Sequence, residues 1–557
     1  MSRMTSKKLN KYFVGGLPII RDVIDRMKLR EILYRYIPRH GNETIAAVES
    51  LLVVIYNLTV GKAPLYELEQ WAASLDCRVL GHSDPLKGQF NDDRFGRALD
   101  KLYEADRCSI LTELVTTVVK QFNLDLSQIH NDSTTVKACG SIPGRTRTGL
   151  ELKNGNSKDY RPDLKQLVYS LSISADGAVP VHQHCYPGNR TDDTTHIETW
   201  KTLCSIHGNA DFLYIADSKL CTDEQLHFIT SRKGCVVTML PNTWKETQEF
   251  KARLRKTRKL KQEIFRRIKP GSETEMEYFY AYQGTYYTHK RGYRIHWIYS
   301  SEKRKRDRAQ REKQMRKAEH ELADLNAKIN RRKLKDREAI EAAANEILTA
   351  CRVKNFYRVQ IGTIQEKQQV QTGKGRPGKD TQYQIRITTL HTLTWSRDRG
   401  AIREESRIDG IFPLLCTETG MSSKEVLQVY KYQPRLEKRF CQFKWIHNAA
   451  PLLFKKIERV EANMFAFFIA LMIQALIERE IRVKMKAEQI PSLTLYPEDR
   501  EASHPTTSKV MALFDGISTY QVCDETEICE KYKDDLSETQ QQILRLMAIP
   551  EKKYWDG

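Results

Sequence analysis

Hydrophobic residues in the first part of the chain recur at helical spacing. Ile20, Val23, Ile24 and Met27 follow steps of three and four residues, which place them on one face of a helix. Residues 45–58 form a second apolar segment of helical length, and glycine- or proline-containing turns separate the two. The pattern predicts a helical N-terminal domain over residues 1–120. Two interpretations of it remain open: a helix-turn-helix-like element, or a packing and oligomerisation domain.

After residue 120 the pattern changes to strands. Asp176-Gly177 between two apolar runs is a hairpin signal. Strands in a hairpin series, followed by strands that alternate with helices, are typical of a mixed sheet covered by helices. We therefore predict a mixed α/β core that begins at 121–241. The expected strands cover 128–136, 167–173, 178–185, 212–216 and 235–240, and the expected helices cover 194–206 and 222–230.

Residues 242–405 interrupt this core and predict an inserted domain. It opens with a basic stretch over 251–269 and contains a long charged helix over 301–350. Apolar residues keep a heptad spacing in that helix, which fits a short coiled-coil hairpin or a solvated arm. They are Met315, Ala318, Leu322, Leu325 and Ile329. The expected strands of the insertion are 277–287, 293–299, 356–364 and 382–395, the last two joined by a flexible segment over 372–378.

Helical periodicity returns near residue 420 and continues to about 485. Within it, residues 464–477 are strongly apolar but end in charged residues, so they are too short to span a bilayer and predict a buried helix. Residues 406–485 would complete the core, and 486–557 would form a tail or small module. The fold class predicted is therefore multidomain α+β, with a helical N-terminal domain, a mixed α/β core interrupted by an insertion of strands plus a long charged helix, and a helical C-terminal part.

The composition indicates the kind of binding partner and the cellular compartment. The chain has 557 residues, and 91 Lys and Arg against 71 Asp and Glu give a net charge of +20. A protein with this excess favours polyanions, of which nucleic acid is the most common. The start of the chain does not have the pattern of a signal peptide, and the 12 cysteines lack zinc-site spacing. We expect reduced thiols and a cytoplasmic protein without membrane association.

Three acidic residues are the candidates for chemistry. Asp132 lies inside a predicted strand, Asp217 ends another, and Glu437 falls in a predicted helix. A carboxylate on a buried strand is costly unless it is paired or bound to a cation. Mg²⁺ prefers oxygen ligands and is often held by a few carboxylates plus substrate phosphate. A strand-end cap or a salt bridge would explain any one of these residues alone, but the set indicates a cation site.

The segment around Glu437 has a polar stripe. Tyr430, Gln433, Glu437, Cys441 and Lys444 follow steps of three, four, four and three residues, so one helix would present all five on one face. Packing alone would make such a stripe apolar. We therefore expect this face to line a site, with Glu437 completing the cation ligands and Lys444 holding a phosphate as a point charge.

These residues carry a family resemblance. Tyr430, Gln433, Glu437 and Lys444 resemble the Tyr-x2-Arg-x3-Glu-x6-Lys signature of bacterial insertion-sequence DDE transposases of the insertion-sequence-four group, with Gln433 in place of the signature Arg. Segments 155–166, 187–192 and 409–410, and the region around 64–66, are similar to the branch typified by insertion sequence sixteen-thirty-four. The resemblance covers most of residues 10–480.

The resemblance implies an RNase H-like core with Asp132 on its first strand, Asp217 at the end of the fourth and Glu437 on a later helix. It implies two Mg²⁺ ions, for which Mn²⁺ is expected to substitute, held by these three catalytic residues. The activity implied is cut-and-paste DNA transposition: cleavage at the terminal inverted repeats of an element, then attack of the exposed 3′-OH on target DNA. The implied partners are these DNA ends and the target. A homodimer in the synaptic complex and a bacterial or archaeal, nucleoid-associated location are also implied.

Further residues are expected to contact DNA. Tyr430, Gln433 and Lys444 belong to the signature, and Lys158, Arg161 and Lys165 lie in the family-like segment. The basic stretches 251–269 and 303–316 have few aromatic residues, which suits contact with backbone phosphates rather than base stacking. The N-terminal domain is a candidate for binding the element ends. Trp244 and Trp297 are candidates for stacking on a flipped base, although a core role explains them more simply.

Three other classes of protein fit parts of the sequence. A catalytically silent DNA-binding relative of a transposase would have lost a carboxylate, whereas all three are present. A metal-dependent nuclease that cuts without joining fits the core, but the signature segment and the insertion favour transposition. A structural coiled-coil protein is suggested only by residues 301–350, whose heptad pattern is short for a chain of this length.

Overall fold

The computed structural model divides the chain into two compact units. The first unit contains residues 1–238 and 428–557, and the second contains residues 239–427. The structure describes residues 8–556 except 40, 42, 62, 83–89, 139–141, 157–160, 162, 258, 270–271, 273, 332–333, 380, 447–453, 497, 499 and 525–526. The predicted α+β class is confirmed, since both units combine helices with strands.

A mixed sheet with strand order β4-β3-β2-β5-β6 lies in the first unit. The strands are β2 (Gln128–Lys137), β3 (Gln166–Ser174), β4 (Pro180–Pro187), β5 (Leu213–Ile215) and β6 (Cys235–Met239). The first three pair antiparallel, and β2–β5 and β5–β6 pair parallel. All five expected strands are present. Gly177, with a φ of +79°, lies in the β3–β4 turn that the Asp-Gly signal predicted.

Two helices connect the parallel strands. Parallel neighbours need a crossover connection, and a helix usually supplies it. Here α7 (His196–His207) leads from β4 to β5, and α8 (Asp223–Thr230) leads from β5 to β6. Both match the predicted helices to within two residues.

The long helix α15 (Ile457–Ala487) is the central core element of the first unit. It packs against β4 and against α1, α3 and α5. Among the described residues, α15 is the one helix that is long and apolar enough, by length and composition, to cross a membrane. In this protein 94% of its most apolar window is buried. The prediction of a buried helix is confirmed. The N-terminal helices are α1 (Leu17–Arg26), α2 (Leu29–Tyr36), α3 (Ala47–Val60), α4 (Leu68–Ala73), α5 (Asp92–Glu104) and α6 (Arg107–Phe122).

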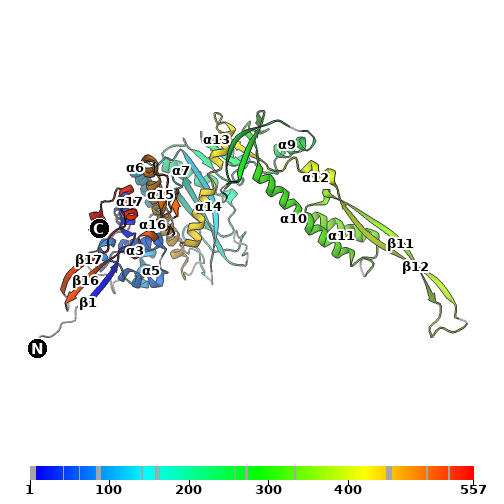
Figure 1. Ribbon diagram of the computed structural model, residues 1–557, viewed down its shortest axis with the longest axis horizontal. Helices are drawn as coiled ribbons and strands as arrows, with labels where there is room; N and C mark the ends of the chain where they lie inside the picture. The colour runs from blue at the N-terminus through cyan, green and yellow to red at the C-terminus, as the bar shows by residue number, and fades with distance from the viewer. Residues whose placement is uncertain are drawn as a thin grey trace. The chain divides into compact units, whose positions relative to one another are not determined.

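The two ends of the chain fold together, which the sequence did not predict. Strand β1 (Lys8–Phe13) pairs antiparallel with β16 (Ser518–Asp524), which pairs with β17 (Glu527–Lys533) (Figure 1). The Tyr554 hydroxyl donates a hydrogen bond to the Gly15 carbonyl at 2.7 Å. Residues 486–557 are therefore integrated with the N-terminal region rather than appended as a free tail. Their other elements are β14 (Leu493–Thr494), β15 (Glu501–Ala502), α16 (Thr507–Leu513), α17 (Glu538–Leu546) and α18 (Glu551–Asp556).

The second unit has its own antiparallel strands in the order β13-β10-β8-β7, with β9 paired to β10. They are β7 (Lys261–Ile268), β8 (Met276–Tyr282), β9 (Tyr286–Tyr287), β10 (Arg294–Ser300) and β13 (Ile411–Cys416), accompanied by α9 (Lys245–Lys256) and α12 (Arg399–Glu405). The single strand expected over 277–287 is two strands. Gly284, with a φ of +111°, makes the turn that separates them.

The charged segment expected over 301–350 is a helical hairpin, which is one of the two arrangements that its heptad spacing predicted, and it is not one continuous helix. Helix α10 (Ser301–Asn326) packs against α11 (Arg337–Ala350). Asn330 adopts a left-handed φ of +64° between them, which ends helical geometry. The chain folds back because the apolar stripe of α10 is buried against that of α11, in a cluster that contains Met315, Leu322, Ile340 and Leu348.

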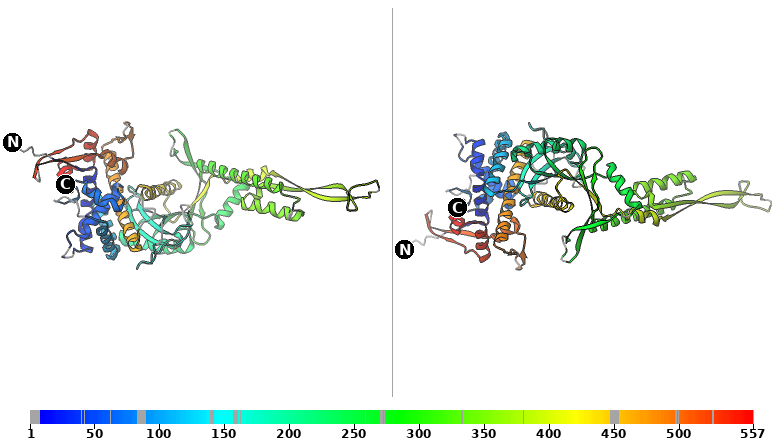
Figure 2. Two further views of the ribbon diagram at one scale, coloured as in Figure 1. Left: turned by 90° about the horizontal axis from the view of Figure 1, so that it is seen from below. Right: turned by 90° about the horizontal axis from the view of Figure 1, so that it is seen from above.

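A two-stranded ribbon follows this helical hairpin. Strands β11 (Tyr357–Gln371) and β12 (Tyr383–Arg397) keep an unbroken antiparallel register from Tyr357–Arg397 to Gln371–Tyr383. Figures 1 and 2 show the ribbon continuing beyond α10 and α11 in every view. Only its base is packed: Tyr357 and Leu393 are buried in the helical cluster, whereas Ile385 in the outer part is 64% exposed.

Candidate functional site

Asp132 and Asp217 occupy equivalent positions on neighbouring parallel strands of the first unit. The register of β2 and β5 pairs His130 with Ile215; Asp132 lies two residues further along β2, and Asp217 lies two residues beyond the end of β5. Partners in a parallel register point to the same face, and neighbouring strands lie about 5 Å apart. The two carboxylates therefore meet at the same edge and on the same side of the sheet.

The alternation of side chains along β2 explains why Asp132 is available there. Asn131 is buried, and its amide group donates hydrogen bonds to the Ser170 and Ser172 hydroxyls and to the Leu171 carbonyl. Ser133 is also buried, whereas Asp132 between them is partly exposed. Successive residues of a strand face opposite sides, so the buried neighbours turn the carboxylate toward the open face.

Asp217 is fixed where β5 ends. Its side chain accepts a hydrogen bond from the Lys219 backbone N–H at 2.9 Å, and its carbonyl accepts one from the Thr238 hydroxyl at 2.6 Å. The second bond connects this residue to the neighbouring strand β6. The carboxylate is thus held at the carboxyl end of a parallel strand, where open α/β sheets bind their ligands.

The signature segment is not one helix, and this corrects the predicted single face. Tyr430 ends α13 (Ser423–Tyr430), residues 431–433 form a turn, and α14 (Pro434–Cys441) begins with a proline. A π-helical turn (Gln442–Ile446) follows and contains Lys444. Proline cannot continue a helix because it lacks an N–H, but it fits the first helical position. Tyr430 therefore belongs to a different helix from Glu437.

Gln433 connects this segment to the sheet. Its amide nitrogen donates to the Asn131 carbonyl at 3.0 Å, and its amide oxygen lies 2.9 Å from His130 Nδ1. Since the oxygen accepts, His130 carries its proton on Nδ1, and burial lowers the pKa of this histidine to about 4. Gln433 is itself 9% exposed. The structure places the expected DNA-contacting Gln433 inside the protein, where it holds the start of α14 on β2.

Arg439 holds the middle of α14. This buried guanidinium donates to the carbonyls of Gly177 and Ala178, both at 3.0 Å, and pairs with Glu478 of α15 at 3.0 Å. Two residues earlier, Glu437 lies on the exposed side of the same helix. The contacts of Gln433 and Arg439 together fix the helix that carries Glu437 between the sheet and α15.

Aromatic packing holds the turn that follows α14. Phe443 stacks on Tyr169 of β3, with ring centroids 4.7 Å apart and an interplanar angle of 12°, and meets Phe467 of α15 edge-on at 5.4 Å. Stacked and edge-on aromatic pairs stabilise beyond the burial of their area. Lys444 follows directly and is partly exposed, so its position is set by this aromatic anchor.

The Tyr430 phenol is half-buried, and the three acidic residues influence its pKa. Burial raises the pKa of its phenol, and the charges of Asp217, Asp132 and Glu437 raise it further, in that order. All three carboxylates thus lie within electrostatic reach of one half-buried hydroxyl. The raised pKa keeps the phenol protonated near neutral pH, so it remains a hydrogen-bond donor.

The carboxylates suit a hard divalent cation in type and position. Oxygen ligands, partial exposure and room for water are the features of Mg²⁺ sites that are completed by substrate phosphate. Asp132 lies on β2, Asp217 lies just after the neighbouring strand β5, and Glu437 lies on the exposed side of α14. In the part of the chain that the structure describes, no three or more His, Cys, Asp or Glu side chains are grouped closely enough to hold a metal ion by themselves.

The other residues predicted to contact DNA differ from one another in exposure and in their contacts. Arg161 is exposed and pairs with Asp163 at 2.7 Å, and Lys165 is exposed beside β3. Lys158 lies outside the described residues. Trp297 in the second unit is 2% exposed and stacks on Phe250 at 3.8 Å, so its core role excludes it as a base-stacking platform in this structure.

His130 and Arg439 support the site but were missed in the sequence. Position 439 has a usable signal, because Leu436, Arg439 and Phe440 fall on the buried face of α14. An arginine on an otherwise apolar helix face indicates a buried ion pair. The role of His130 has no such signal, since it depends on Gln433, 303 residues away in the chain.

Residues 9–116 match a family model described as a domain of unknown function (DUF4277). This range falls within the predicted N-terminal domain. No curated protein matches the chain. Among solved structures, the chain is similar to a piggyBac transposase in a cryo-EM synaptic complex with hairpin DNA. The identity is 8%, the TM-score is 0.24, and the match covers 85% of this chain and 84% of that chain. A TM-score this low does not establish a shared fold.

Proposed function

We propose that this protein is a metal-dependent DNA transposase of the DDE type. The observation that carries the proposal is the parallel pairing of β2 and β5, which brings Asp132 on β2 toward Asp217 just after β5. The order of Asp132, Asp217 and Glu437 along the chain and their elements match what the signature resemblance implies: a first strand, the end of a fourth strand and a later helix. The mixed sheet that carries them supports assignment as an RNase H-like core.

Asp132, Asp217 and Glu437 would hold Mg²⁺, with two ions expected and Mn²⁺ as a substitute. When bound, the metal lowers the cost of activating the attacking oxygen and of releasing the leaving oxygen in phosphoryl transfer. The Tyr430 phenol, kept protonated, donates a hydrogen bond to a phosphate oxygen. Gln433 and Arg439 hold α14 so that Glu437 stays opposite the two aspartates.

The substrate class proposed is the DNA at the ends of a mobile element. Cleavage there by water exposes a 3′-OH, and attack of that hydroxyl on target DNA exchanges one phosphodiester for another, so no external energy source is needed. Lys444 next to the Glu437 helix supplies a positive charge for the DNA backbone. The net charge of +20 supports general affinity for DNA. A homodimer would bring two ends together, and a cytoplasmic, nucleoid-associated location follows from the substrate.

The test is a cleavage and joining assay with the full chain. Purified protein is incubated with a DNA fragment that carries the element end and with a supercoiled target plasmid, in Mg²⁺ or in EDTA. The proposal predicts Mg²⁺-dependent cleavage and end fragments covalently joined to the plasmid. Cleavage without joined product would identify a nuclease instead. Binding without cleavage in Mg²⁺ or Mn²⁺ would identify a catalytically silent DNA-binding protein.

A further inference from the structure

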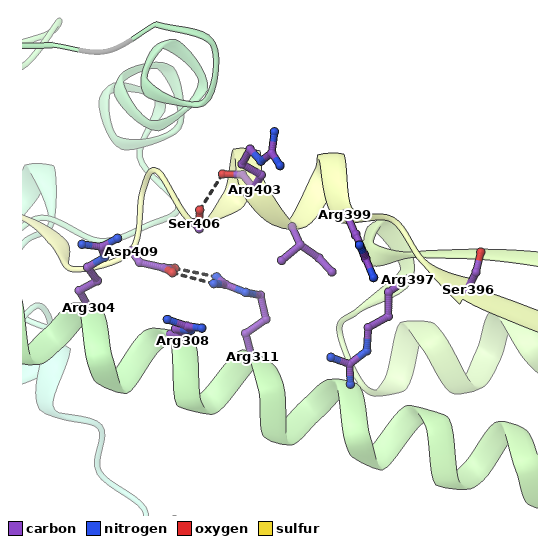
Figure 3. A pocket seen from close by; sticks show the side chains of 10 residues that line it. Arg304, Arg308, Arg311, Ser396, Arg397, Arg399, Arg403, Ser406 and Asp409 are labelled. Atoms are coloured by element: carbon purple, nitrogen blue, oxygen red, sulfur yellow. Dashed lines mark hydrogen bonds and ion pairs between the residues drawn. The ribbon is translucent and has the colours of Figure 1, made fainter.

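A cavity of about 800 Å³ in the second unit is lined mainly by arginines (Figure 3). It lies between α10 and the segment that contains the end of β12, α12 and the approach to β13. The lining arginines are Arg304, Arg308, Arg311, Arg397, Arg399 and Arg403. Asp409 is the one acidic residue among the lining residues that the structure describes.

Helical spacing gathers these arginines. Arg304, Arg308 and Arg311 follow steps of four and three residues, which place them on one face of α10. Arg399 and Arg403 of α12 both contribute to the lining, and Figure 3 shows the Arg399 side chain pointing toward α10 and the Arg403 guanidinium pointing away from it. Two helix faces therefore present guanidinium groups to one space, an arrangement that electrostatic repulsion alone would oppose.

Internal carboxylates neutralise only part of this charge. Arg311 makes two hydrogen bonds of 2.7 Å to the two oxygens of Asp409, and Arg397 pairs with Glu312 and Glu319. Among the described residues, no carboxylate lies within ion-pair distance of the other four lining arginines. Those four are Arg304, Arg308, Arg399 and Arg403. The cavity thus keeps several guanidinium groups available for an external anion.

We propose that this arginine pocket binds consecutive phosphates of a nucleic acid backbone. Guanidinium groups recognise phosphate through paired N–H donors, for which lysine is a weaker substitute. Arg304 and Arg308 lie about 6 Å apart along α10, at about 1.5 Å per residue. That length exceeds the rise of about 3.4 Å between neighbouring phosphates of one DNA strand, so the two arginines match more than one phosphate.

The other residues that line the pocket indicate which part of the nucleic acid is bound. The other lining residues are Ser396, Ile402 and Ser406, and aromatic side chains are absent from the described lining. Base recognition in single strands and nucleotide binding usually rely on an aromatic stacking surface. The pocket therefore fits the backbone and would position DNA without reading its sequence. The choice of DNA as the nucleic acid rests on the proposed function, whereas the phosphate chemistry does not.

The test compares two charge-matched double variants of the full chain. Arg308→Gln with Arg399→Gln removes two exposed pocket arginines, and Arg306→Gln with Lys313→Gln removes two exposed cations of α10 that do not line the pocket. Binding to a mixed-sequence duplex is measured by fluorescence anisotropy in EDTA over a range of salt. EDTA keeps the result independent of catalysis, so an inactive protein would leave this test readable.

The pocket variant is expected to bind about 10- to 100-fold more weakly, with a salt slope reduced by about two, while the control pair changes binding less than about threefold. Equal losses in both variants would mean general surface attraction and would overturn the proposal. So would unchanged DNA binding combined with lost binding of tripolyphosphate, because the pocket would then serve a small polyphosphate. Unchanged melting temperatures ensure that the comparison concerns folded protein.

Discussion

Asp132 on β2 and Asp217 just after the parallel neighbour β5 each lie two residues beyond the register pair His130–Ile215. This relationship places two carboxylates side by side although 85 residues separate them in the chain. Glu437 lies on the exposed side of a helix that is fixed at one end by Gln433 and in the middle by Arg439.

Arg439→Met should destabilise the protein by about 3–5 kcal/mol, because the buried Glu478 carboxylate loses its 3.0 Å ion pair and keeps only the longer one with Arg482 at 3.5 Å. It should also reduce cleavage more than DNA binding, since α14 carries Glu437. Urea unfolding gives the first quantity, and cleavage and anisotropy assays give the second. Lys438→Met, at the exposed neighbouring position, is the control. Equal stability of the two variants would show that Arg439 does not hold the helix.

His130 should make stability depend on pH. Its pKa is lowered from 6.5 to about 4 by burial, so between these values the folded protein binds fewer protons than the unfolded chain. Stability should therefore fall as the pH decreases from about 6.5 to 4, by up to about 1.4 kcal/mol per pH unit from this group. Other buried histidines, such as His182 with a pKa lowered to about 3, add to the trend.

His130→Asn isolates this contribution. Asparagine keeps a donor near the position of Nδ1, so it preserves the contact with Gln433 while removing the titratable group. The slope of unfolding free energy against pH should become shallower below pH 6.5, and His227→Asn at an exposed position should leave it unchanged. An identical slope in wild type and His130→Asn would refute the assignment of a neutral, buried imidazole.

Tyr430→Phe should lower the cleavage rate by about 10- to 100-fold, the effect of one hydrogen bond to a charged group of about 1.5–3 kcal/mol. The phenyl ring preserves packing, so the melting temperature should stay within a few degrees. Cleavage kinetics over saturating DNA separate the rate from the affinity. A variant with full activity would mean that the hydroxyl does not touch the reacting phosphate.

The outer part of the β11–β12 ribbon should be dispensable for folding. Joining Thr363 to His391, which are register partners, through an Asn-Gly turn removes the exposed outer strands and keeps the buried base at Tyr357 and Leu393. We expect the free energy of unfolding to change by less than about 0.5 kcal/mol, as for other surface changes. A large loss of stability in chemical unfolding would show that the outer ribbon packs elsewhere.

Local patterns in the sequence predicted most elements but not their long-range pairing. The five strands of the first sheet and helices α7, α8 and α15 follow from periodicity and turn residues near them. The pairing of β1 with β16 links segments about 500 residues apart, and its strands carry no signal of their partner. Pro434 predicts a helix start at this position, because proline favours the first turn of a helix. The polar stripe from Tyr430 to Lys444 predicts one continuous helix instead, and the structure has the break.

The candidate site shows the same division. Asp132, Asp217 and Glu437 were predicted from residue type, position and a family signature, and they stay a prediction, whereas the parallel register of β2 and β5 and the contacts of Gln433 depend on long-range pairing. The arginine pocket could not be foreseen, because α10 and α12 supply it from segments 95 residues apart, as between Arg308 and Arg403.

The most direct test of the central claim is Mg²⁺-dependent cleavage of end-bearing DNA by Asp132→Asn, Asp217→Asn and Glu437→Gln beside the wild type. These isosteric changes remove negative charge without removing packing. The account predicts that each variant keeps its melting temperature and DNA affinity while cleavage falls by at least about a thousandfold, the scale of losing an essential metal ligand. Full Mg²⁺-dependent cleavage in any one of the three folded variants would contradict it.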